Sequence, residues 1–339
     1  MPGRMVLFNA AAFVAFALCQ TASAGTLDDV IARDTLKCGV NQGLPGFAFV
    51  DVTGRRAGLD ADTCRAVAAA VLGDADRVTF VPLSPKERFT TLQTGVVDLL
   101  IQNTTWTLLR DTALELDFAG VNFYDGQGFL VQRELELTSA LELDGALVCV
   151  PFATTTEINL VDYFRKNDLD LRTSTFETAK DAAAAYEAGL CDALTYDLSG
   201  LVSYRSHFEN PSDHVLLPEI ISKEPLGPVV RHGDNQWSDV VRWTLFALIQ
   251  AEESGVTSAN VDDMKLSNDP TIQRLLGVNG HLGRHLGLSN HWAETIIRQV
   301  GNYGEIYDRN VGPDTPIGLD RGLNALWRDG GLHYAMPFH

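Results

Sequence analysis

The segment GVVDLLIQNTTWTLLR, residues 95–110, contains the pattern that decides the fold class. Val96–Ile101 is predicted to form a buried strand, which stops at the amide and hydroxyl side chains of Gln102–Thr105. A helix is expected to follow, with Thr107 as its N-cap and Arg110 three residues later. Because open α/β sheets bind ligands beyond the carboxyl ends of their strands, the segment predicts an α/β fold with a binding site at this point.

This alternation of short apolar strands and amphipathic helices occurs in two successive βαβαβ blocks. The first block begins with the strand Leu36–Val40, and the second begins with the strand Ala146–Val150. Two such blocks predict two similar α/β lobes. The helix Asp239–Glu253 and shorter helices after it, including Trp292–Val300 and Leu319–Arg328, are expected to cover the first lobe.

The first 24 residues have the pattern of a signal peptide. Met1–Arg4 carries one positive charge, Met5–Leu18 is mostly apolar, and Ala22-Ser23-Ala24 is a small-x-small cleavage signal. The apolar run is too short to span a bilayer as a permanent helix. We therefore expect export, with the mature chain beginning at Gly25 and working in the periplasm.

The charge and length limit the functions that the mature chain can have. Removal of residues 1–24, which hold one arginine and no acid, changes the net charge from −18 to −19. So acidic a protein is not expected to bind nucleic acid or an anionic membrane surface. The length of the remaining chain exceeds what one hydrophobic core usually serves, so two domains are expected.

Four cysteines remain once Cys19 is removed with the signal peptide. An even number in an exported chain predicts two disulfides, for which three connectivities are possible. We favour Cys38–Cys64 and Cys149–Cys191, which place one pair in each lobe; four free thiols are the alternative. No C-x-x-C motif occurs and no histidine lies at ligand spacing from these cysteines, so no metal site is expected.

Two cationic or donor groups are candidates for binding an anion. The planar fork of Arg110 suits a carboxylate, although a surface salt bridge with Asp111 or Asp117 is the alternative role. Thr154 and Glu157 form a capping box, so a helix is expected to begin there, and its free N–H groups favour an anion. Thr155 is the threonine that we expect to face a ligand, while a purely structural cap is the alternative.

Asp197 is the candidate for binding a cation. It follows the predicted strand Asp192–Tyr196, where its carboxylate could hold an ammonium group, although it could instead cap a helix through Ser199–Tyr204. Together with Arg110 and Thr155 it forms a recognition set for a zwitterion. Closure of two lobes around such a solute would remove water and strengthen each interaction.

The chain after residue 24 resembles the periplasmic amino-acid-binding proteins of ABC transporters, solute-binding protein family 3, and is most similar to the general L-amino-acid binders among them. The matching segments are CGVNQGLPGF (38–47), PLSPKERFTTLQTGVVDLL (82–100), NTTWTLLRDT (103–112), LDFAGVNFYDGQGF (116–129), TTTEINLVDYFR (154–165), LPEIISKEPLGPVVRHGD (217–234), WTLFALIQAEE (243–253) and GNYGEIYDRNVG (301–312). The resemblance implies a two-lobed periplasmic binding protein of type II, with a ligand cleft between the lobes.

The resemblance also implies a role for each residue of the site. Arg110 would hold the α-carboxylate, helped by Thr105 and the backbone near Thr155, and Asp197 would hold the α-ammonium. Further ligand contacts would come from the helix-start residue Thr154 and from an acceptor at Asn103. The side-chain pocket would be walled by Asn41 and Phe47, and its rim would include Arg88 and Trp106.

The resemblance further implies domain limits and partners. Residues 25–130 and 223–339 would form lobe 1 with a C-terminal helical extension, and residues 131–222 would form lobe 2. A monomer would deliver free L-amino acids to an inner-membrane ABC permease, with the two intralobe disulfides and without a cofactor.

Three departures from the family pattern concern the breadth of the pocket. They are Gln102, where arginine is expected, Pro151-Phe152-Ala153, where small residues are expected, and the bulky Tyr196. The competing functions are an exported, dehydratase-like enzyme and a ligand-sensing domain on the same fold. The sequence contains no G-x-S-x-G or H-E-x-x-H motif that would favour the enzyme.

Overall fold

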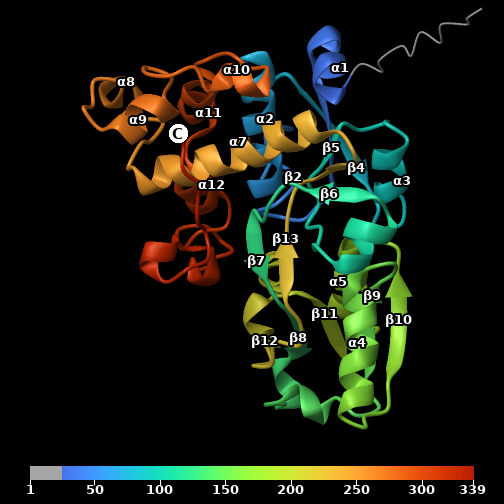
Figure 1. Cartoon of the computed structure of the whole chain (residues 1–339). Coiled ribbons are helices and arrows are strands. Elements are labelled where there is room, and N and C mark those ends of the chain that lie inside the picture. Colours follow the sequence, from blue (N-terminus) through green and yellow to red (C-terminus); the bar gives the residue numbers. More distant parts are fainter. Residues whose placement is uncertain (1–24) are drawn as a thin grey trace, which may run out of the picture.

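The computed structural model describes residues 25–339. The predicted signal peptide, residues 1–24, lies outside the described residues. None of the helices within residues 25–339 combines the length and hydropathy needed to span a membrane. Figure 1 shows two α/β bodies, one above the other, with a group of C-terminal helices beside the upper one.

The upper body, lobe 1, is built on a five-stranded sheet of order β4-β1-β5-β14-β6. Its strands are β1 (Leu36–Asn41), β4 (Val78–Leu83), β5 (Leu99–Leu100), β6 (Leu116–Phe118) and β14 (Val229–Arg231). β1 pairs in parallel with β4 and β5, whereas β14 runs antiparallel to β5 and β6. A small hairpin and three helices complete the N-terminal part: β2 (Phe49–Val50), β3 (Arg56–Ala57), α1 (Thr26–Arg33), α2 (Leu59–Leu72) and α3 (Arg88–Gln93).

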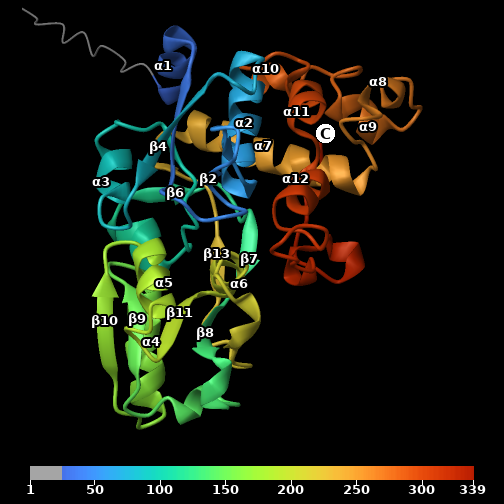
Figure 2. The ribbon, with the colours of Figure 1, turned by 180° about the vertical axis from the view of Figure 1, so that it is seen from behind.

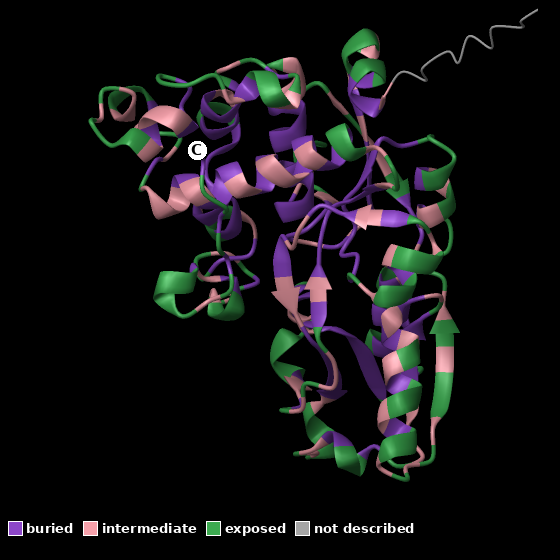
Figure 3. Ribbon diagram, in the orientation of Figure 1, coloured by how far each residue is buried: buried purple, intermediate pink, exposed green. Residues whose placement is uncertain are grey.

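The lower body, lobe 2, is built on a second five-stranded sheet, of order β10-β9-β11-β8-β12. Its strands are β8 (Gln127–Gln132), β9 (Leu147–Pro151), β10 (Arg172–Phe176), β11 (Ala193–Asp197) and β12 (His214–Leu216), and its helices are α4 (Thr155–Lys166), α5 (Ala179–Glu187) and α6 (Leu198–Arg205). The central strand β11 is buried along its whole length, as expected for a strand covered on both faces (Figure 3). The two predicted βαβαβ blocks therefore correspond to two sheets.

Two short antiparallel strands connect the lobes: β7 (Phe123–Asp125) and β13 (Glu224–Leu226), which we call the connecting ribbon. The chain passes from the first sheet to the second through β7 and returns through β13. The boundary expected between residues 130 and 131 falls inside β8, all of which pairs within the second sheet. The boundary expected between residues 222 and 223 lies immediately before β13.

The chain after β14 returns to lobe 1 and packs on α2 through α7 and α11 (Figures 1 and 2). Its helices are α7 (Asn235–Glu253), α8 (Val261–Met264), α9 (Pro270–Leu275), α10 (Gly283–Leu286), α11 (Trp292–Val300) and α12 (Tyr303–Asn310). The helix predicted at Leu319–Arg328 is wrong. Two 3₁₀ turns, Gly322–Asn324 and Trp327–Asp329, occupy that segment, because Gly322 adopts a positive φ of 47° that interrupts a helix.

The C-terminal extension also contacts the connecting ribbon. The Asn324 side chain accepts a hydrogen bond from the Tyr124 backbone N–H (2.7 Å) and donates one to the Tyr124 carbonyl (3.0 Å). The Tyr303 hydroxyl donates to the carbonyl of Asn122, just before β7 (2.8 Å). Strand β7 is thus held by β13 on one side and by the extension on the other.

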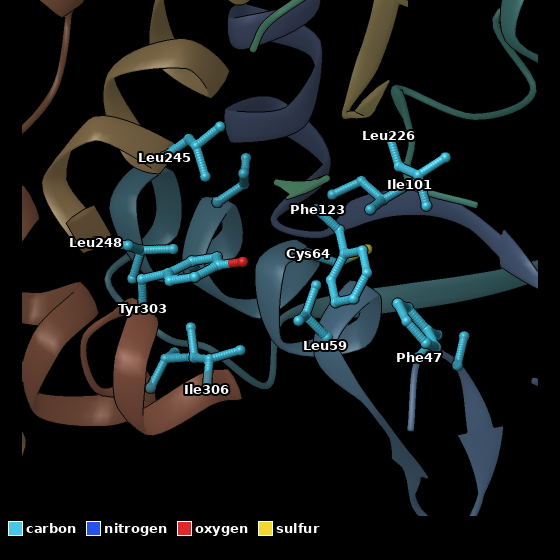
Figure 4. Packing of buried hydrophobic residues seen from close by; sticks show 14 of the residues in the cluster. Phe47, Leu59, Cys64, Ile101, Phe123, Leu226, Leu245, Leu248, Tyr303 and Ile306 are labelled. Atoms are coloured by element: carbon cyan, nitrogen blue, oxygen red, sulfur yellow. The ribbon is translucent and has the colours of Figure 1, made fainter. Parts of the chain in front are cut away.

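The disulfides join Cys38 to Cys64 and Cys149 to Cys191. The first links β1 to α2 within lobe 1, and the second links β9 to the turn just before β11 within lobe 2. This pairing is the one favoured from the sequence. Figure 4 shows Cys64 in the core of lobe 1, near the rings of Phe47 and Phe123.

The local elements around the predicted site differ from expectation in two respects. Strand β5 covers only Leu99–Leu100 of the predicted Val96–Ile101, because Gly95 turns the chain with a φ of 75° and Val96 is exposed. The helix expected after Thr107 is a single π-helical turn, Leu109–Ala113. Thr107 still accepts a hydrogen bond from the Arg110 N–H (3.2 Å), as a capping residue does.

Candidate ligand-binding site

Arg110 lies in lobe 1 with only 6% of its surface exposed. Its Nη1 donates to the Thr105 carbonyl (2.8 Å), and its guanidinium lies 5.2 Å from the centre of the Phe89 ring. Among the described residues Arg110 forms no salt bridge, and Asp117 pairs with His232 instead (2.8 Å). The alternative role in a surface salt bridge is therefore wrong, and most of the guanidinium fork is available to a ligand.

Arg88, at the start of α3, is a second buried guanidinium beside Arg110. Its Nη1 donates to the Gln102 carbonyl (3.1 Å), and it lies 4.8 Å from the same Phe89 ring. Burial lowers the pKa of Arg110 to about 9, with a further contribution from Arg88, and burial lowers the pKa of Arg88 to about 10. Two guanidinium groups that are this close together and excluded from solvent favour the binding of an anion.

Asp197 ends β11 in lobe 2 and is 4% exposed. It occupies the N-cap position of α6 but makes no capping hydrogen bond, so the alternative role as a helix cap is wrong. Burial raises the pKa of Asp197 well above its usual value. The charges of Asp125 and Glu224 add to this rise, and those of Arg88 and Arg110 oppose it.

The charges of the two lobes face each other without touching. Within residues 25–339 no salt bridge of 4.0 Å or less joins Asp197 to either guanidinium, although each influences the other's pKa. The carboxylate of Asp197 also has no hydrogen-bond donor among those residues. The arrangement thus presents an acceptor from lobe 2 and a donor fork from lobe 1, both incompletely satisfied.

The two threonines at the start of α4 have different contacts. Thr154 donates to the Pro151 carbonyl (2.8 Å) and accepts from the Glu157 N–H (3.3 Å), so its hydroxyl caps the helix. The Thr155 hydroxyl lies 3.2 Å from the Thr105 hydroxyl of lobe 1. Thr155, and not Thr154, therefore faces the opposite lobe, and its predicted contact with a ligand stays a prediction.

Two acids of the connecting ribbon, the buried Glu224 and the partly buried Asp125, were not predicted as site residues. They lie opposite each other in the pairing of β13 with β7. Glu224 accepts hydrogen bonds from Thr105 (2.5 Å) and Thr155 (3.2 Å), while Asp125 accepts from the hydroxyl and N–H of Ser199. Burial raises the pKa of Asp125 to about 6, and the charge of Glu224 adds to the rise. We call Arg88, Arg110, Asp125, Asp197 and Glu224 the interlobe cluster.

The family comparison identifies this architecture. Residues 36–255 match the bacterial extracellular solute-binding proteins, family 3. The chain belongs to this family. The expected α/β fold with two lobes, the exported location and the role in solute binding are thereby confirmed.

Named relatives in this family cover nearly the whole protein. The general L-amino acid-binding periplasmic protein AapJ of Rhizobium johnstonii is 55% identical over 94% of both chains. The glutamate/glutamine/aspartate/asparagine-binding protein BztA of Rhodobacter capsulatus is 51% identical over 99% of both. A periplasmic binding protein of an ABC transporter from Brucella ovis, solved with glutathione bound, superposes with a TM-score of 0.91 at 54% identity, over 94% of this chain and all of that one. These relatives are binding proteins.

Two residues expected to wall the pocket of this family 3 protein have other contacts. Phe47 is fully buried and packs edge-on against Phe123 (5.2 Å between ring centres) inside the lobe 1 core (Figure 4). The Asn41 side chain accepts from the Gly43 N–H (3.1 Å) and so shapes its own loop. Trp106, expected at the rim, is 39% exposed and stacks on Phe118 (5.4 Å).

The polar cluster after β5 presents two unpaired acceptors. Asn103 adopts a φ of 44°, and its N–H donates to Asp60 (3.2 Å). The side-chain oxygens of Asn103 and Gln102 are both buried without a hydrogen-bond donor in the described part of the chain. Gln102 also donates to the Leu83 carbonyl (2.6 Å), so its amide is fixed in orientation. Phe152 is about half exposed, whereas Tyr196 is buried beside Asp197.

Proposed function

We propose that this chain is the periplasmic solute-binding subunit of an ABC transporter, and that it captures free L-amino acids between its lobes and delivers them to an inner-membrane permease. The named relatives support this substrate class, because two are described as binding L-amino acids or four particular amino acids. We further propose that the protein acts as a monomer, has no catalytic activity, and closes about the connecting ribbon.

One observation carries the substrate assignment: a buried carboxylate of lobe 2 without a hydrogen bond faces two buried guanidiniums of lobe 1. A buried charge without a partner is costly, so Asp197 and Arg110 each require an opposite charge. They do not meet within salt-bridge distance of each other. A zwitterion would satisfy both at once, with its α-carboxylate on the Arg110 fork and its α-ammonium on Asp197.

The same assignment accounts for the chemical range of the relatives' ligands. An acidic amino acid, an amide amino acid and the γ-glutamyl end of glutathione share a free α-ammonium and α-carboxylate. A clamp that contacts only this common part would accept different side chains. A free amino acid has on the order of ten heavy atoms, so micromolar binding, about −8 kcal/mol, lies within the per-atom ceiling for small ligands.

Calorimetry on protein freed of solute by unfolding and refolding tests this proposal. The panel comprises the twenty L-amino acids and glutathione, together with the α-amide and the deaminated analogue of each amino acid that binds. We expect at least one L-amino acid to bind at micromolar concentration, and both analogues to bind more than about 100-fold more weakly, because each leaves one buried charge unpaired.

Variants locate the clamp. Arg110→Ala should abolish binding with the fold intact, whereas Arg55→Ala, which removes an exposed arginine of the same lobe, should bind as the wild type does. The proposal is wrong if refolded wild-type protein binds none of the panel, or if Arg110→Ala retains near-normal affinity.

A further inference from the structure

The carboxylate of Glu224 joins the two lobes through neutral hydrogen-bond donors. It is 1% exposed and lies on strand β13 of the connecting ribbon. Oε2 accepts from Thr105 of lobe 1 (2.5 Å) and from Thr155 of lobe 2 (3.2 Å). Oε1 accepts from Asn159 of lobe 2 (2.8 Å) and from Ser222, two residues before it in the chain (2.5 Å).

These four bonds satisfy the charge without a salt bridge. An ionised carboxylate has about four acceptor sites, and here each oxygen receives two donors. No cation lies within salt-bridge distance of Glu224 in residues 25–339. The charge therefore depends on hydroxyl and amide donors, two of which, Thr155 and Asn159, are carried by helix α4 of lobe 2.

We propose that Glu224 is a closure latch: a positioning residue whose carboxylate draws α4 of lobe 2 against Thr105 of lobe 1 and so stabilises the closed arrangement in which solute is held. The proposal rests on the proposed function only in assuming that solute affinity depends on lobe closure. The latch itself acts whether or not a solute is present.

Opening of the lobes would weaken this set of contacts more than any neutral interlobe contact. Movement of α4 away from lobe 1 would break the hydrogen bonds that Thr155 and Asn159 donate to the buried Glu224 carboxylate. Hydrogen bonds to charged groups are stronger than hydrogen bonds between neutral groups. Two other interlobe contacts of the described residues, the Thr105–Thr155 hydroxyl pair (3.2 Å) and the hydrogen bond from the Ser203 hydroxyl to the Pro45 carbonyl (2.6 Å), involve no charge.

The latch also determines which donors reach the solute. A threonine hydroxyl has a single proton, and the Thr105 proton is given to Glu224. The solute carboxylate is consequently left to the Arg110 fork, and Thr105 contributes no donor to it. Glu224 also lies opposite Asp125 in the ribbon, and its charge raises the pKa of both Asp125 and Asp197. Loss of that charge should therefore lower both pKa values.

The test is Glu224→Gln, compared with Glu219→Gln as the matched control. Glu219 accepts from Ser139 (2.5 Å) and from the Ala140 N–H (2.9 Å), both within lobe 2, so its loss leaves the interlobe contacts intact. X-ray scattering of the solute-free protein measures closure, and calorimetry from pH 4 to pH 8 measures affinity for the amino acid that binds the wild type best.

We expect Glu224→Gln to increase the radius of gyration of the solute-free protein and to weaken solute binding about tenfold, equivalent to about 1.4 kcal/mol. We also expect the pH below which solute binding is lost, which we call the acid limit, to move to a lower value. A purely structural role of Glu224 would not cause this change. Thr155→Val, which keeps the charge and removes one lobe 2 donor, should open the protein without moving the acid limit.

Unchanged scattering for Glu224→Gln, tighter solute binding by it, or equal effects in Glu219→Gln would each overturn the latch. Because scattering requires no solute, it tests the latch even if no amino acid binds. Failure of the latch can thus be told apart from failure of the proposed function.

Discussion

Replacement of Asp197 by asparagine should weaken solute binding and, at neutral and alkaline pH, stabilise the solute-free protein. Asparagine keeps the shape of the side chain and removes its charge. Truncation of one partner in a buried charge pair costs about 2–5 kcal/mol, and this near-isosteric change belongs to the lower part of that range. A cost of about 3 kcal/mol corresponds to a loss of affinity of about 150-fold.

The effect on stability has the opposite sign because the pKa of Asp197 is raised. Burial, first, and then the charges of Asp125 and Glu224 raise that pKa in the solute-free protein. The folded state therefore binds this proton more tightly than the unfolded state, whose aspartate pKa is about 4. Stability is consequently lost as the pH rises above about 4 and through the raised folded pKa. The substituted asparagine cannot ionise, so the variant lacks this loss.

Two measurements check this reasoning. Thermal unfolding of solute-free protein should give equal midpoints for wild type and Asp197→Asn at pH 4, and a higher midpoint for the variant at pH 8. Calorimetry in buffers of different ionisation enthalpy should detect proton release when the wild type binds solute at neutral pH, because an ammonium favours ionised Asp197. Asp170→Asn, an exposed aspartate of the same lobe, is the control. Near-normal affinity in Asp197→Asn, or a lower midpoint for it at pH 8, would refute the assignment.

Two further predictions concern folding. Burial raises the pKa of Asp60 to about 7, so its ionisation should destabilise the folded protein by about 4 kcal/mol at pH 8, and Asp60→Asn should be more resistant to urea there but not at pH 4. Loss of Cys38–Cys64 and of Cys149–Cys191, which close loops of 26 and 42 residues, should lower the free energy of unfolding by about 3.5 and about 4 kcal/mol, measured by urea unfolding of the paired alanine variants. A pH-independent Asp60→Asn difference, or unchanged urea midpoints in the disulfide variants, would contradict them.

Local sequence signals were sufficient for the groups that lie at the ends of regular elements. Arg110 follows a buried strand and a run of polar residues, and Asp197 ends a strand that is buried throughout. Thr155 begins a helix with a recognisable capping pattern. The pattern of its own segment identifies each of these side chains as a candidate, because open α/β sheets bind ligands beyond the carboxyl ends of their strands.

The acids of the connecting ribbon have no such signal. Glu224 and Asp125 belong to strands of three residues, one of which contains Pro225, so neither strand shows a period. The two acids come close together only because β7 and β13, which are far apart in the sequence, pair with each other. Phe47 shows the converse difficulty, because a loop phenylalanine has the same sequence signature whether it faces a ligand or, as here, Phe123 in the core.

The contact between Asn324 and Tyr124 has a consequence for the protein as a unit. The family match ends at residue 255, yet the polar groups of Tyr124 are paired by a residue from beyond that point. A chain shortened to the matched region would expose the backbone of β7 along one edge. Bare edges are templates for pairing with other chains, so we expect a chain without the C-terminal extension to self-associate more readily.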